Sequence, residues 1–235
     1  MKALCISASN MKHAGDKGTS LIACQIIEKI IKTRLKRKNI QVDITSRSDV
    51  KLKPCLGCGK CFQTNKCSAN DDFNAIYCQI ADSDAIFIAS PHYAPIPAKL
   101  SVLLEKMEQI SFLHWFHENS YQPTLYKKPV GIIAHGRGSE DWAMRPYKTM
   151  VLDAIENALQ TIMVDVVGID DKSPNGVVFP VKEVLKKEND IFLVQLYDWT
   201  DIENRLTLLV EKLIAKADKK AQGNRLLDSQ YRLSV

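Results

Sequence analysis

The chain has 235 residues, of which 46% are hydrophobic, and a formal net charge of +5. This composition excludes a disordered chain and is enough to bury a large core, so we expect one α/β domain. No apolar run has the length of a membrane span, and no signal-peptide pattern precedes the first apolar segment, which predicts a cytoplasmic protein without a membrane partner. The seven cysteines, an odd number, are expected to remain reduced.

Much of the positive charge is concentrated in one segment. Lys32, Arg34, Lys36, Arg37 and Lys38 follow one another at the end of a predicted helix, where cations complement the helix dipole. Because no aromatic residue is interleaved with them, we interpret this segment as a solvated helix end and expect no nucleic-acid partner. An attraction for phosphorylated dinucleotides stays open.

The first half of the chain alternates between apolar strands and amphipathic helices. The predicted elements are a strand over 2–7, a helix from about Thr19, a strand over 40–45, a helix from Asp71 or Asp72 to 81, and a strand over 85–89. A polar loop follows the first strand, and a cysteine-rich loop over 53–72 follows the second.

The second half continues the alternation less regularly. The predicted elements are a helix over 98–110, an irregular stretch over 111–128, a strand over 130–134, a helix over 144–159, a strand over 163–169, and a helix over 201–219. The segment 170–200 contains a turn and two apolar stretches that indicate an inserted hairpin. A polar tail over 220–235 is expected to fray or to pack on a partner subunit.

Continuous apolar strands separated by amphipathic helices are typical of a parallel sheet covered on both faces. We therefore predict an α/β fold with a doubly wound five-stranded parallel sheet, forming a single domain over 1–219. In such a sheet ligands bind beyond the carboxyl ends of the strands. Three loops leave the sheet at that edge, namely those after Ser7, Ser90 and Ala134.

The first of these loops has the features of a phosphate cradle. Ser9 and Asn10 supply polar groups, Gly18 supplies backbone freedom, and Thr19 and Ser20 stand at the start of a helix, whose N-terminus attracts anions. The alternative interpretation is that Thr19 or Ser20 is only an N-cap. Neither a Walker loop nor a G-x-G-x-x-G pattern is present.

The other two loops favour a flat ring. Three prolines stiffen the segment 90–97, in which Tyr93 offers a planar aromatic beside small residues. In the segment 134–139, two glycines allow close backbone approach, and His135 and Arg137 can donate to a carbonyl or to negative charge on a reduced ring.

Four cysteines lie close together in the second inter-strand loop. Cys55, Cys58, Cys61 and Cys67 have the spacing C-x2-C-x2-C-x5-C, and thiolates this close can converge on one iron–sulfur cube. A tetrahedral zinc site and an empty loop are the alternatives, although zinc sites usually pair two separated knuckles. The remaining cysteines, Cys5, Cys24 and Cys78, stand among apolar residues and are expected to pack in the core.

These motifs together resemble the flavodoxin-like NADPH-dependent FMN reductase superfamily, in particular its iron–sulfur flavoprotein branch. The resemblance covers most of 1–170. The family's Gly-Ser-Pro-Arg loop is matched by Ala8-Ser9-Asn10-Met11, its Asn-Thr-Ser helix start by Gly18-Thr19-Ser20, and its Ser-Pro-x-Tyr loop by Ser90-Pro91-His92-Tyr93. Its glycine-containing loop after the fourth strand corresponds to 135–138.

The resemblance implies FMN as the cofactor. It implies that Ser9, Thr19 and Ser20 hold the phosphate and that the second and third loops surround the isoalloxazine ring. The complete predicted cofactor site comprises Ser9, Asn10, Met11, Gly18, Thr19, Ser20, Pro91, His92, Tyr93, Ala94, His135, Gly136, Arg137 and Gly138. Asn10-Met11 replaces the family's Pro-Arg, so Lys12, Lys17 or the backbone would have to offset the phosphate charge.

The iron–sulfur branch also implies that the four cysteines bind one [4Fe-4S] cluster. The leading hypothesis is then an oxidoreductase in which FMN accepts two electrons from NAD(P)H or from a ferredoxin-type donor, and a cluster next to the flavin carries single electrons. No side chain is expected to be an obligatory acid or base. A homo-oligomer, dimer or tetramer, is expected if flavin and cluster belong to different subunits.

Two further hypotheses stay open. One is a cluster-free NAD(P)H-dependent reductase of FMN, quinones or nitro compounds. The other is an electron carrier that binds FMN without turning over a small substrate.

Overall fold

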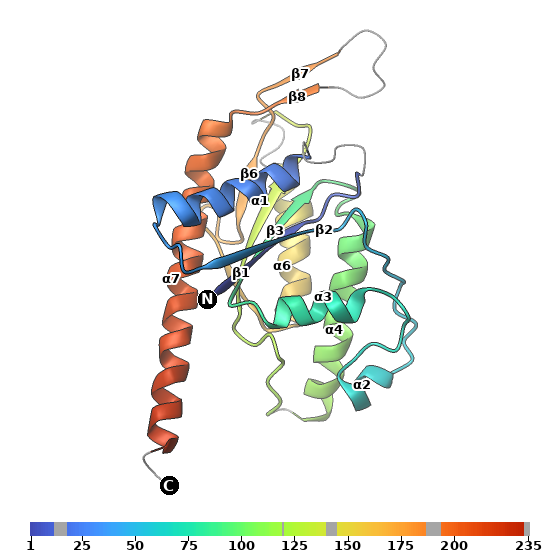
Figure 1. Cartoon of the computed structure of the whole chain (residues 1–235). Helices are drawn as coiled ribbons and strands as arrows, with labels where there is room; N and C mark the ends of the chain where they lie inside the picture. Colours follow the sequence, from blue (N-terminus) through green and yellow to red (C-terminus); the bar gives the residue numbers. More distant parts are fainter. Residues whose placement is uncertain (12–17, 119, 140–144, 187–193, 233–235) are drawn as a thin grey trace.

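The computed structural model of the chain describes residues 1–11, 18–118, 120–139, 145–186 and 194–232. Its main sheet is parallel, as the sequence predicts, and the strand order is β2-β1-β3-β4-β5, with β6 also paired to β4 (Figure 1). The strands are β1 (Lys2–Ser7), β2 (Gln41–Ser46), β3 (Ala85–Pro91), β4 (Pro129–His135), β5 (Asp165–Val167) and β6 (Val177–Phe179). Every residue of β3 and β4 is buried, which explains why both appear as uninterrupted apolar runs.

Two short strands share the last position of the sheet. β5 pairs with Pro129–Gly131 of β4, and β6 pairs with Ile133–His135 farther along the same strand. The single strand expected over 163–169 is therefore interrupted by the turn-rich segment 168–176 and resumes beyond it. This resumption places Phe179 beside His135 at the carboxyl edge.

Helices cover both faces of the sheet (Figure 1). One face packs against α1 (Thr19–Lys29), its π-helical continuation η2 (Ile30–Arg34) and α7 (Trp199–Arg232). The other packs against α3 (Phe73–Ala81), α4 (Ala98–His117), the π-helical turn η3 (Lys148–Leu152) and α6 (Asp153–Gln160). A one-turn helix, α2 (Lys60–Thr64), lies within the cysteine loop.

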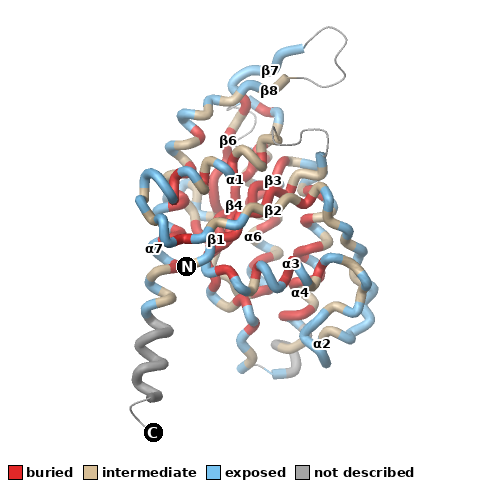
Figure 2. The backbone as a smooth tube through the Cα atoms, viewed as in Figure 1, coloured by how far each residue is buried: buried red, intermediate tan, exposed pale blue. Residues whose placement is uncertain are grey.

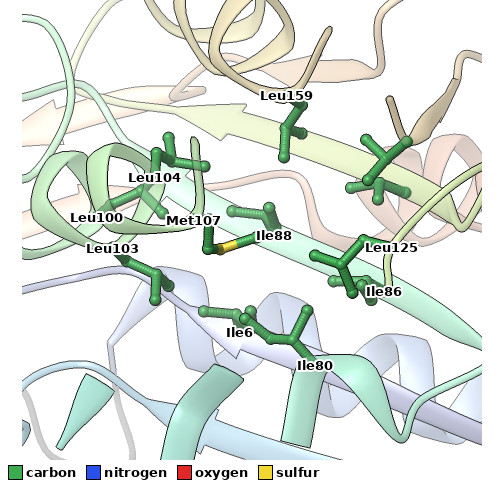
Figure 3. Close-up of a pocket in the computed structure, with 12 residues that line it drawn as sticks. Ile6, Ile80, Ile86, Ile88, Leu100, Leu103, Leu104, Met107, Leu125 and Leu159 are labelled. Atoms are coloured by element: carbon green, nitrogen blue, oxygen red, sulfur yellow. The ribbon is translucent and has the colours of Figure 1, made fainter. Parts of the chain in front are cut away.

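The buried apolar residues form two clusters, one on each side of the sheet. Figure 2 shows that buried residues are concentrated along the strands and on parts of the helices that cover them. Figure 3 shows the layer under α4, where Ile6, Ile88 and Met107 point toward one another. The cavity between these side chains has a volume of only about 10 Å³, roughly one water-sized sphere. This layer is therefore packed core and leaves no space for a cofactor.

The basic segment after α1 is not simply solvated. Arg37 donates two hydrogen bonds of 2.9 Å to Asp218 of α7, and Arg34 lies 3.0 Å from Glu203 of the same helix. Lys36 and Lys38 are exposed. Part of the positive charge therefore ties two helices together, which corrects the expectation of a solvated helix end.

Two helices extend beyond their predicted ends. α4 continues to His117 because Ile110 and Ser111 are still buried, at 2% and 1% exposure. α7 runs to Arg232 instead of ending near 219, since 220–232 contains no proline and its glycine costs a helix only about 1 kcal/mol. The predicted polar tail is thus largely helical.

The hairpin expected within 170–200 is present. β7 (Glu183–Leu185) and β8 (Val194–Leu196) pair in antiparallel register and project beyond the end of the sheet at which β6 ends (Figure 1). In the part of the chain that is described, none of the helices is both long and apolar enough to cross a bilayer.

Candidate functional site

The three predicted loops meet at the carboxyl edge of the sheet. β1, β3 and β4 are neighbours in the sheet, and Pro91 is in register with His135. The backbone N–H of His92 donates a 2.8 Å hydrogen bond to the carbonyl of His135, and the N–H of Ala8 donates one of 2.9 Å to the carbonyl of Ala89. These bonds hold the first residues of the loops against the neighbouring strands.

A buried hydrogen bond lies beneath this edge. The hydroxyl of Ser20, at the start of α1, is 2.7 Å from Nε2 of His135. The His135 ring stacks on Phe179, with centroids 5.4 Å apart and planes within 4°. Burial lowers the pKa of His135 to about 3, so its imidazole is neutral near pH 7. In this structure Ser20 and His135 therefore bind each other.

Tyr147 supports the loop after β4. The backbone N–H of Gly138 donates a 2.7 Å hydrogen bond to the Tyr147 hydroxyl. A β-carbon placed on Gly136 would lie 2.4 Å from both Cζ and the hydroxyl oxygen of Tyr147, so any larger residue would force the loop or the tyrosine to shift. Burial raises the pKa of Tyr147. The ring of His92 also lies beside Tyr147, and the centroids of the two rings are 5.3 Å apart.

Tyr197, which follows the hairpin, reaches the same loop. Its hydroxyl lies within hydrogen-bonding distance of two acceptors that share its one hydrogen, Oε1 of Gln195 at 2.7 Å and the Gly136 carbonyl at 3.2 Å. Burial raises the pKa of Tyr197 to about 12, although a hydrogen bond with Thr19 opposes the shift. Tyr197 also contacts Phe179 edge-on at 5.9 Å. The hairpin segment thereby contributes to the edge at which the predicted loops meet.

Two buried polar atoms at this edge have no partner among the described residues. They are Oδ1 of Asn10, in the first loop, and Nε2 of His92, in the second. An unsatisfied buried polar atom costs about 1–3 kcal/mol, so a ligand with polar groups would relieve both. Gly18 is the N-cap of α1 and has no side chain to bond the first N–H groups of the helix, which stay available to an anion.

The predicted cofactor residues differ in their accessibility. Met11, Tyr93, Ala94 and Arg137 are exposed, Ser9, Asn10, Gly18, Thr19, His92 and Gly136 are half-buried, and Ser20, Pro91, His135 and Gly138 are buried. Lys12 and Lys17, the candidates for offsetting a phosphate charge, lie outside the described residues. The edge thus presents an aromatic ring, a guanidinium and backbone groups to solvent.

The four clustered cysteines line a second site. Cys55, Cys58, Cys61 and Cys67 line one cavity of about 110 Å³, which Gln109 of α4 also lines. Gly57 and Gly59 have φ of 61° and 67°, a left-handed conformation that glycine adopts without a steric cost. The glycines therefore let the loop turn back on itself.

Residues at the start of α3 hold this loop in place. Asn74 accepts a 2.9 Å hydrogen bond from the N–H of Cys67 and donates one of 2.8 Å to its carbonyl. The Asp71 carboxylate accepts a 2.8 Å bond from the N–H of Lys53 and forms a fully buried ion pair with Lys106 of α4. Burial alone would raise the pKa of Asp71, but these hydrogen bonds outweigh it and lower the pKa.

The thiols of the loop affect one another electrostatically. Burial and the charges of Cys55, Cys67 and Cys58 raise the pKa of Cys61. Hydrogen bonds from Ser68 and from the N–H of Lys60 lower the pKa of the exposed Cys58. Across the described ranges, no three histidine, cysteine or acidic side chains are arranged closely enough to hold a metal ion. The loop groups four soft ligands without the geometry of a closed metal site.

The other cysteines divide into two classes. Cys5 and Cys24 are buried, which confirms their core role, and a hydrogen bond with Cys24 raises the pKa of Cys5. Cys78 is exposed, which corrects the expectation that it packs in the core. It lies on the outer face of α3, whose buried face carries Phe73, Ile76, Tyr77 and Ile80.

Comparison with known proteins connects this geometry to a family. The family model described as NADPH-dependent FMN reductase matches residues 1–145, which include all three edge loops up to Ser139 and the complete cysteine loop. The chain belongs to the NADPH-dependent FMN reductase family. The resemblance suggested by the loop motifs is thereby confirmed.

Two curated relatives of this FMN reductase family member are named iron-sulfur flavoprotein. The protein from Archaeoglobus fulgidus is 28% identical over 134 residues, 57% of this chain and 53% of the relative. The protein from Methanosarcina thermophila is 33% identical over 86 residues, 35% of this chain and 45% of the relative. The chain thus spans about half the length of the curated relatives that it matches.

Solved structures agree on the fold. The crystal structure of RosB with bound 8-demethyl-8-formylriboflavin-5'-phosphate superposes with a TM-score of 0.58 at 12% identity, covering 100% of this chain and 88% of RosB. At this identity the likeness concerns the fold alone. It supports the flavodoxin-like α/β architecture of this FMN reductase family member.

Sequence motifs alone did not indicate the aromatic side chains that support the carboxyl edge. Phe179, Tyr147 and Tyr197 contact His135, Gly138 and Gly136 from three segments outside the predicted loops. Phe179 could have been found from the sequence, because it is the last residue of the short apolar run Val177–Phe179. The residues that end β1, β3 and β4 also stand at the end of apolar runs. Tyr147 and Tyr197 stand in segments without a recognisable motif.

Proposed function

We propose that the chain is an FMN-dependent oxidoreductase that binds FMN at the carboxyl edge of the sheet and a [4Fe-4S] cluster at the cysteine loop. The observation that carries this proposal is the cavity lined by Cys55, Cys58, Cys61 and Cys67 in a chain whose first 145 residues match the FMN reductase family. Four thiolates are the usual ligand set of such a cluster.

For the flavin, the free helix end and the unpartnered atoms suggest the arrangement. Ser9, Thr19 and the N–H groups at the start of α1 would hold the phosphate. Asn10 and His92 have buried atoms that need polar partners, and Tyr93 offers an exposed ring for stacking. FMN would supply two-electron chemistry with a nicotinamide, while the protein orients the ring.

For the cluster, the cysteine loop offers the ligands and α3 positions them. Gln109 and the loop glycines line the cavity together with the cysteines, and Asn74 fixes the backbone of Cys67. The donor set fits an iron–sulfur centre, which exchanges one electron at a time. The physiological donor would be NAD(P)H or a ferredoxin-type protein, and the exposed cysteine loop suggests a homo-oligomer, dimer or tetramer, in the cytoplasm.

A second candidate is a cluster-free NAD(P)H-dependent reductase of FMN, quinones or nitro compounds. It is favoured by one observation, that the described cysteines are not arranged as a metal site. A carrier that binds FMN and exchanges electrons without turning over NAD(P)H is the third. Steady-state oxidation of NAD(P)H by a preparation free of iron separates the second candidate from the third.

The deciding experiment is an absorption spectrum with iron and sulfide analysis of protein purified without oxygen. The proposal expects flavin bands over a broad iron–sulfur shoulder and about four irons per chain. Flavin bands without iron would favour the cluster-free reductase. If added FMN does not bind, the assignment of the flavin edge is wrong.

A matched substitution tests where FMN binds. Gly136→Ala places a methyl group 2.4 Å from the Tyr147 ring, so the loop must shift and FMN affinity is expected to fall at least tenfold, or about 1.4 kcal/mol. Gly131→Ala is the control, because its new contacts are with the flexible ends of Leu213 and Leu209 in the core. Titration of apoprotein followed by flavin fluorescence measures both, and equal affinities would contradict this placement.

A further inference from the structure

The loop after β4 is held by two tyrosines that come from opposite faces of the sheet. Tyr147, which directly precedes η3, belongs to the buried cluster on the α4 face. Tyr197, which lies between β8 and α7, packs against the cluster on the α1 face. Both lie beyond residue 145, where the match to the FMN reductase family ends. The family match therefore assigns no role to either tyrosine.

The two hydroxyl groups contact neighbouring peptide units of this loop. The Tyr197 hydroxyl is 3.2 Å from the carbonyl oxygen of Gly136, and the Tyr147 hydroxyl accepts a 2.7 Å hydrogen bond from the N–H of Gly138. A trans peptide unit is planar, so the Gly136 carbonyl and the N–H of Arg137 point in opposite directions. That N–H is hydrogen-bonded to Tyr147, where it opposes the rise in the pKa of Tyr147 that burial causes. The carbonyl therefore faces one tyrosine, and two successive N–H groups face the other.

A third contact fixes the next peptide unit. The N–H of Val181, two residues after β6, donates a 3.0 Å hydrogen bond to the carbonyl of Gly138. The backbone of 136–138 is thus oriented by three groups outside the loop before a ligand binds. A loop that is already ordered loses less conformational entropy on binding, which increases affinity without a new contact.

Each tyrosine is itself held in place. Tyr147 is 1% exposed, and its ring centroid lies 5.3 Å from that of His92. Tyr197 contacts Phe179 and Trp199, with ring centroids 5.9 Å and 5.3 Å apart. Residues whose own side chains are fixed by packing hold a neighbouring group within a narrow range of geometry. Both hydroxyl groups can therefore act as fixed points for the loop.

We propose that the hydroxyl groups of Tyr147 and Tyr197 form a clamp that positions residues 136–138 for the isoalloxazine ring. This inference rests on the proposed function, because it takes the loop after β4 as the place where the ring binds. Both tyrosines are positioning residues, since they act through the loop backbone. The clamp contributes to the affinity of the ring, whereas the phosphate is held by the first loop and the start of α1.

The test separates binding of the ring from binding of the phosphate. The probes are FMN and riboflavin, which differ only in the 5′-phosphate, titrated into the apoprotein and followed by flavin fluorescence. Tyr147→Phe keeps the aromatic ring and removes the hydroxyl. It is expected to bind both flavins about fivefold more weakly than the wild type, as the loss of one orienting hydrogen bond implies. A loss confined to FMN would place the effect at the phosphate and overturn the clamp.

Tyr197→Phe tests the other side of the clamp. It should also bind riboflavin about fivefold more weakly. The comparison of FMN with riboflavin is made on Tyr147→Phe, because the Tyr197 hydroxyl has a hydrogen bond with Thr19 at the predicted phosphate site. Tyr197 is half-buried, so its variant decides on riboflavin affinity if Tyr147→Phe does not fold.

A matched control and a double variant complete the test. Tyr126 is half-buried like Tyr197 but precedes β4 at its other end, so Tyr126→Phe should keep both affinities within about twofold of the wild type. Because both hydroxyls hold one short segment, releasing either should free the loop. Tyr147→Phe/Tyr197→Phe is therefore expected to lose less riboflavin affinity than the product of the two single losses. A loss equal to that product would mean that the hydroxyls act independently and would contradict the clamp.

The remaining outcomes distinguish this inference from the proposed function. Wild-type affinity in both single variants would overturn the clamp and leave the flavin site in place. Tighter binding by Tyr147→Phe would do the same, since the hydroxyl would then compete with the flavin for the N–H of Gly138. If the wild-type protein binds neither flavin, the proposed flavin site fails, and the clamp fails with it.

Discussion

His135 is the buried titratable side chain on which the carboxyl edge depends. It is bonded to Ser20, stacked on Phe179, and has its carbonyl hydrogen-bonded to the N–H of His92. With an exposure of 5%, its charged form would be poorly solvated, and burial lowers the pKa to about 3. Its neutrality therefore holds together segments from β4, β6 and α1.

This environment predicts a pH-dependent stability. Between pH 6.5 and 3 the unfolded chain binds a proton at His135 that the folded apoprotein does not, so the free energy of unfolding falls as the pH is lowered through this window. The contribution approaches about 1.4 kcal/mol per pH unit. The variant His135→Asn lacks this titrating group, so its free energy of unfolding does not carry the His135 contribution. The difference in free energy of unfolding between wild type and variant should therefore narrow as the pH is lowered. Urea unfolding at pH 7, 6 and 5 measures this.

Because all other titrating groups are common to both proteins, their contributions cancel in the comparison. Parallel pH profiles for the wild type and His135→Asn would show that His135 is protonated in the folded protein, contrary to its buried position. Ser20→Ala provides a second check, since it leaves Nε2 of His135 unpartnered and should cost about 1–3 kcal/mol at pH 7.

At the scale of elements, the cysteine loop is positioned by α3 and α4 more than by its own contacts. The loop contains one helical turn, α2, flanked by Gly59 and Asn65, both with positive φ. Asp71, which precedes α3, accepts a hydrogen bond from the N–H of Lys53 at one end of the loop. Asn74, in the first turn of α3, accepts one from the N–H of Cys67 at the other end. Lys106 links Asp71 to α4. The arrangement of the thiols therefore depends on residues outside the motif.

Loosening this anchor should release iron. Asn74→Ala removes both hydrogen bonds to Cys67, worth about 1–2 kcal/mol together, and we expect iron to be lost to a chelator several-fold faster than from the wild type. Asn70→Ala is the matched control, because Asn70 is an exposed residue of the same loop. A colorimetric chelator assay on protein kept without oxygen measures the rate of iron release from both variants.

Lys106→Met tests the same anchor from α4. It leaves the buried Asp71 carboxylate without its counter-ion, a loss of about 3–5 kcal/mol, so its iron content should fall further than that of Asn74→Ala. Circular dichroism distinguishes iron loss from unfolding. If both variants keep iron as long as Asn70→Ala does, α3 does not position the ligands.

The sequence predicted the elements whose residues follow a regular local pattern. Apolar runs located β1, β3 and β4 within one or two residues, since strands buried on both faces leave an unbroken hydrophobic pattern. The cysteine spacing indicated a shared site, because four thiols on one short loop can converge on a common ligand. Local pattern was sufficient wherever the structure depends on neighbours in sequence.

Long-range pairing was beyond the sequence pattern. Lys106 occupies what looks like a solvent position of α4, yet it is 2% exposed because Asp71 lies opposite it. Arg47 follows β2 as an ordinary polar residue but is 0% exposed, and burial lowers its pKa to about 10. Tyr197 reaches Gly136 across 61 residues. The partners of Lys106 and Tyr197 lie 35 and 61 residues away along the chain, so periodicity gives no sign of them.

At the scale of the whole molecule, the two candidate sites are separate. The loop after β3 leads directly into α4 at Ala98, whereas the cysteine cavity meets α4 at Glu105 and Gln109. At 1.5 Å per residue, the cavity lies about 10–17 Å along the helix from the edge. Figure 1 shows α2 beside the lower part of α4, away from the β7–β8 hairpin. The candidate cofactor residues and the cavity residues have no member in common.

This separation predicts that the two sites load independently. Cys58→Ser/Cys61→Ser removes two ligands from the cavity, and because the carboxyl edge shares no residue with it, FMN affinity should stay within about twofold of the wild type, or about 0.4 kcal/mol, while iron is lost. Gly136→Ala should show the converse, with weaker FMN binding and unchanged iron.

The exposed Cys78 gives the control Cys78→Ser, which should alter neither FMN affinity nor iron content. FMN titration and iron analysis of the same anaerobic samples, including the combined triple variant, complete the cycle. A tenfold loss of FMN affinity in the cysteine variant would mean that loop and edge are coupled through α4, since that helix is the element that contacts both.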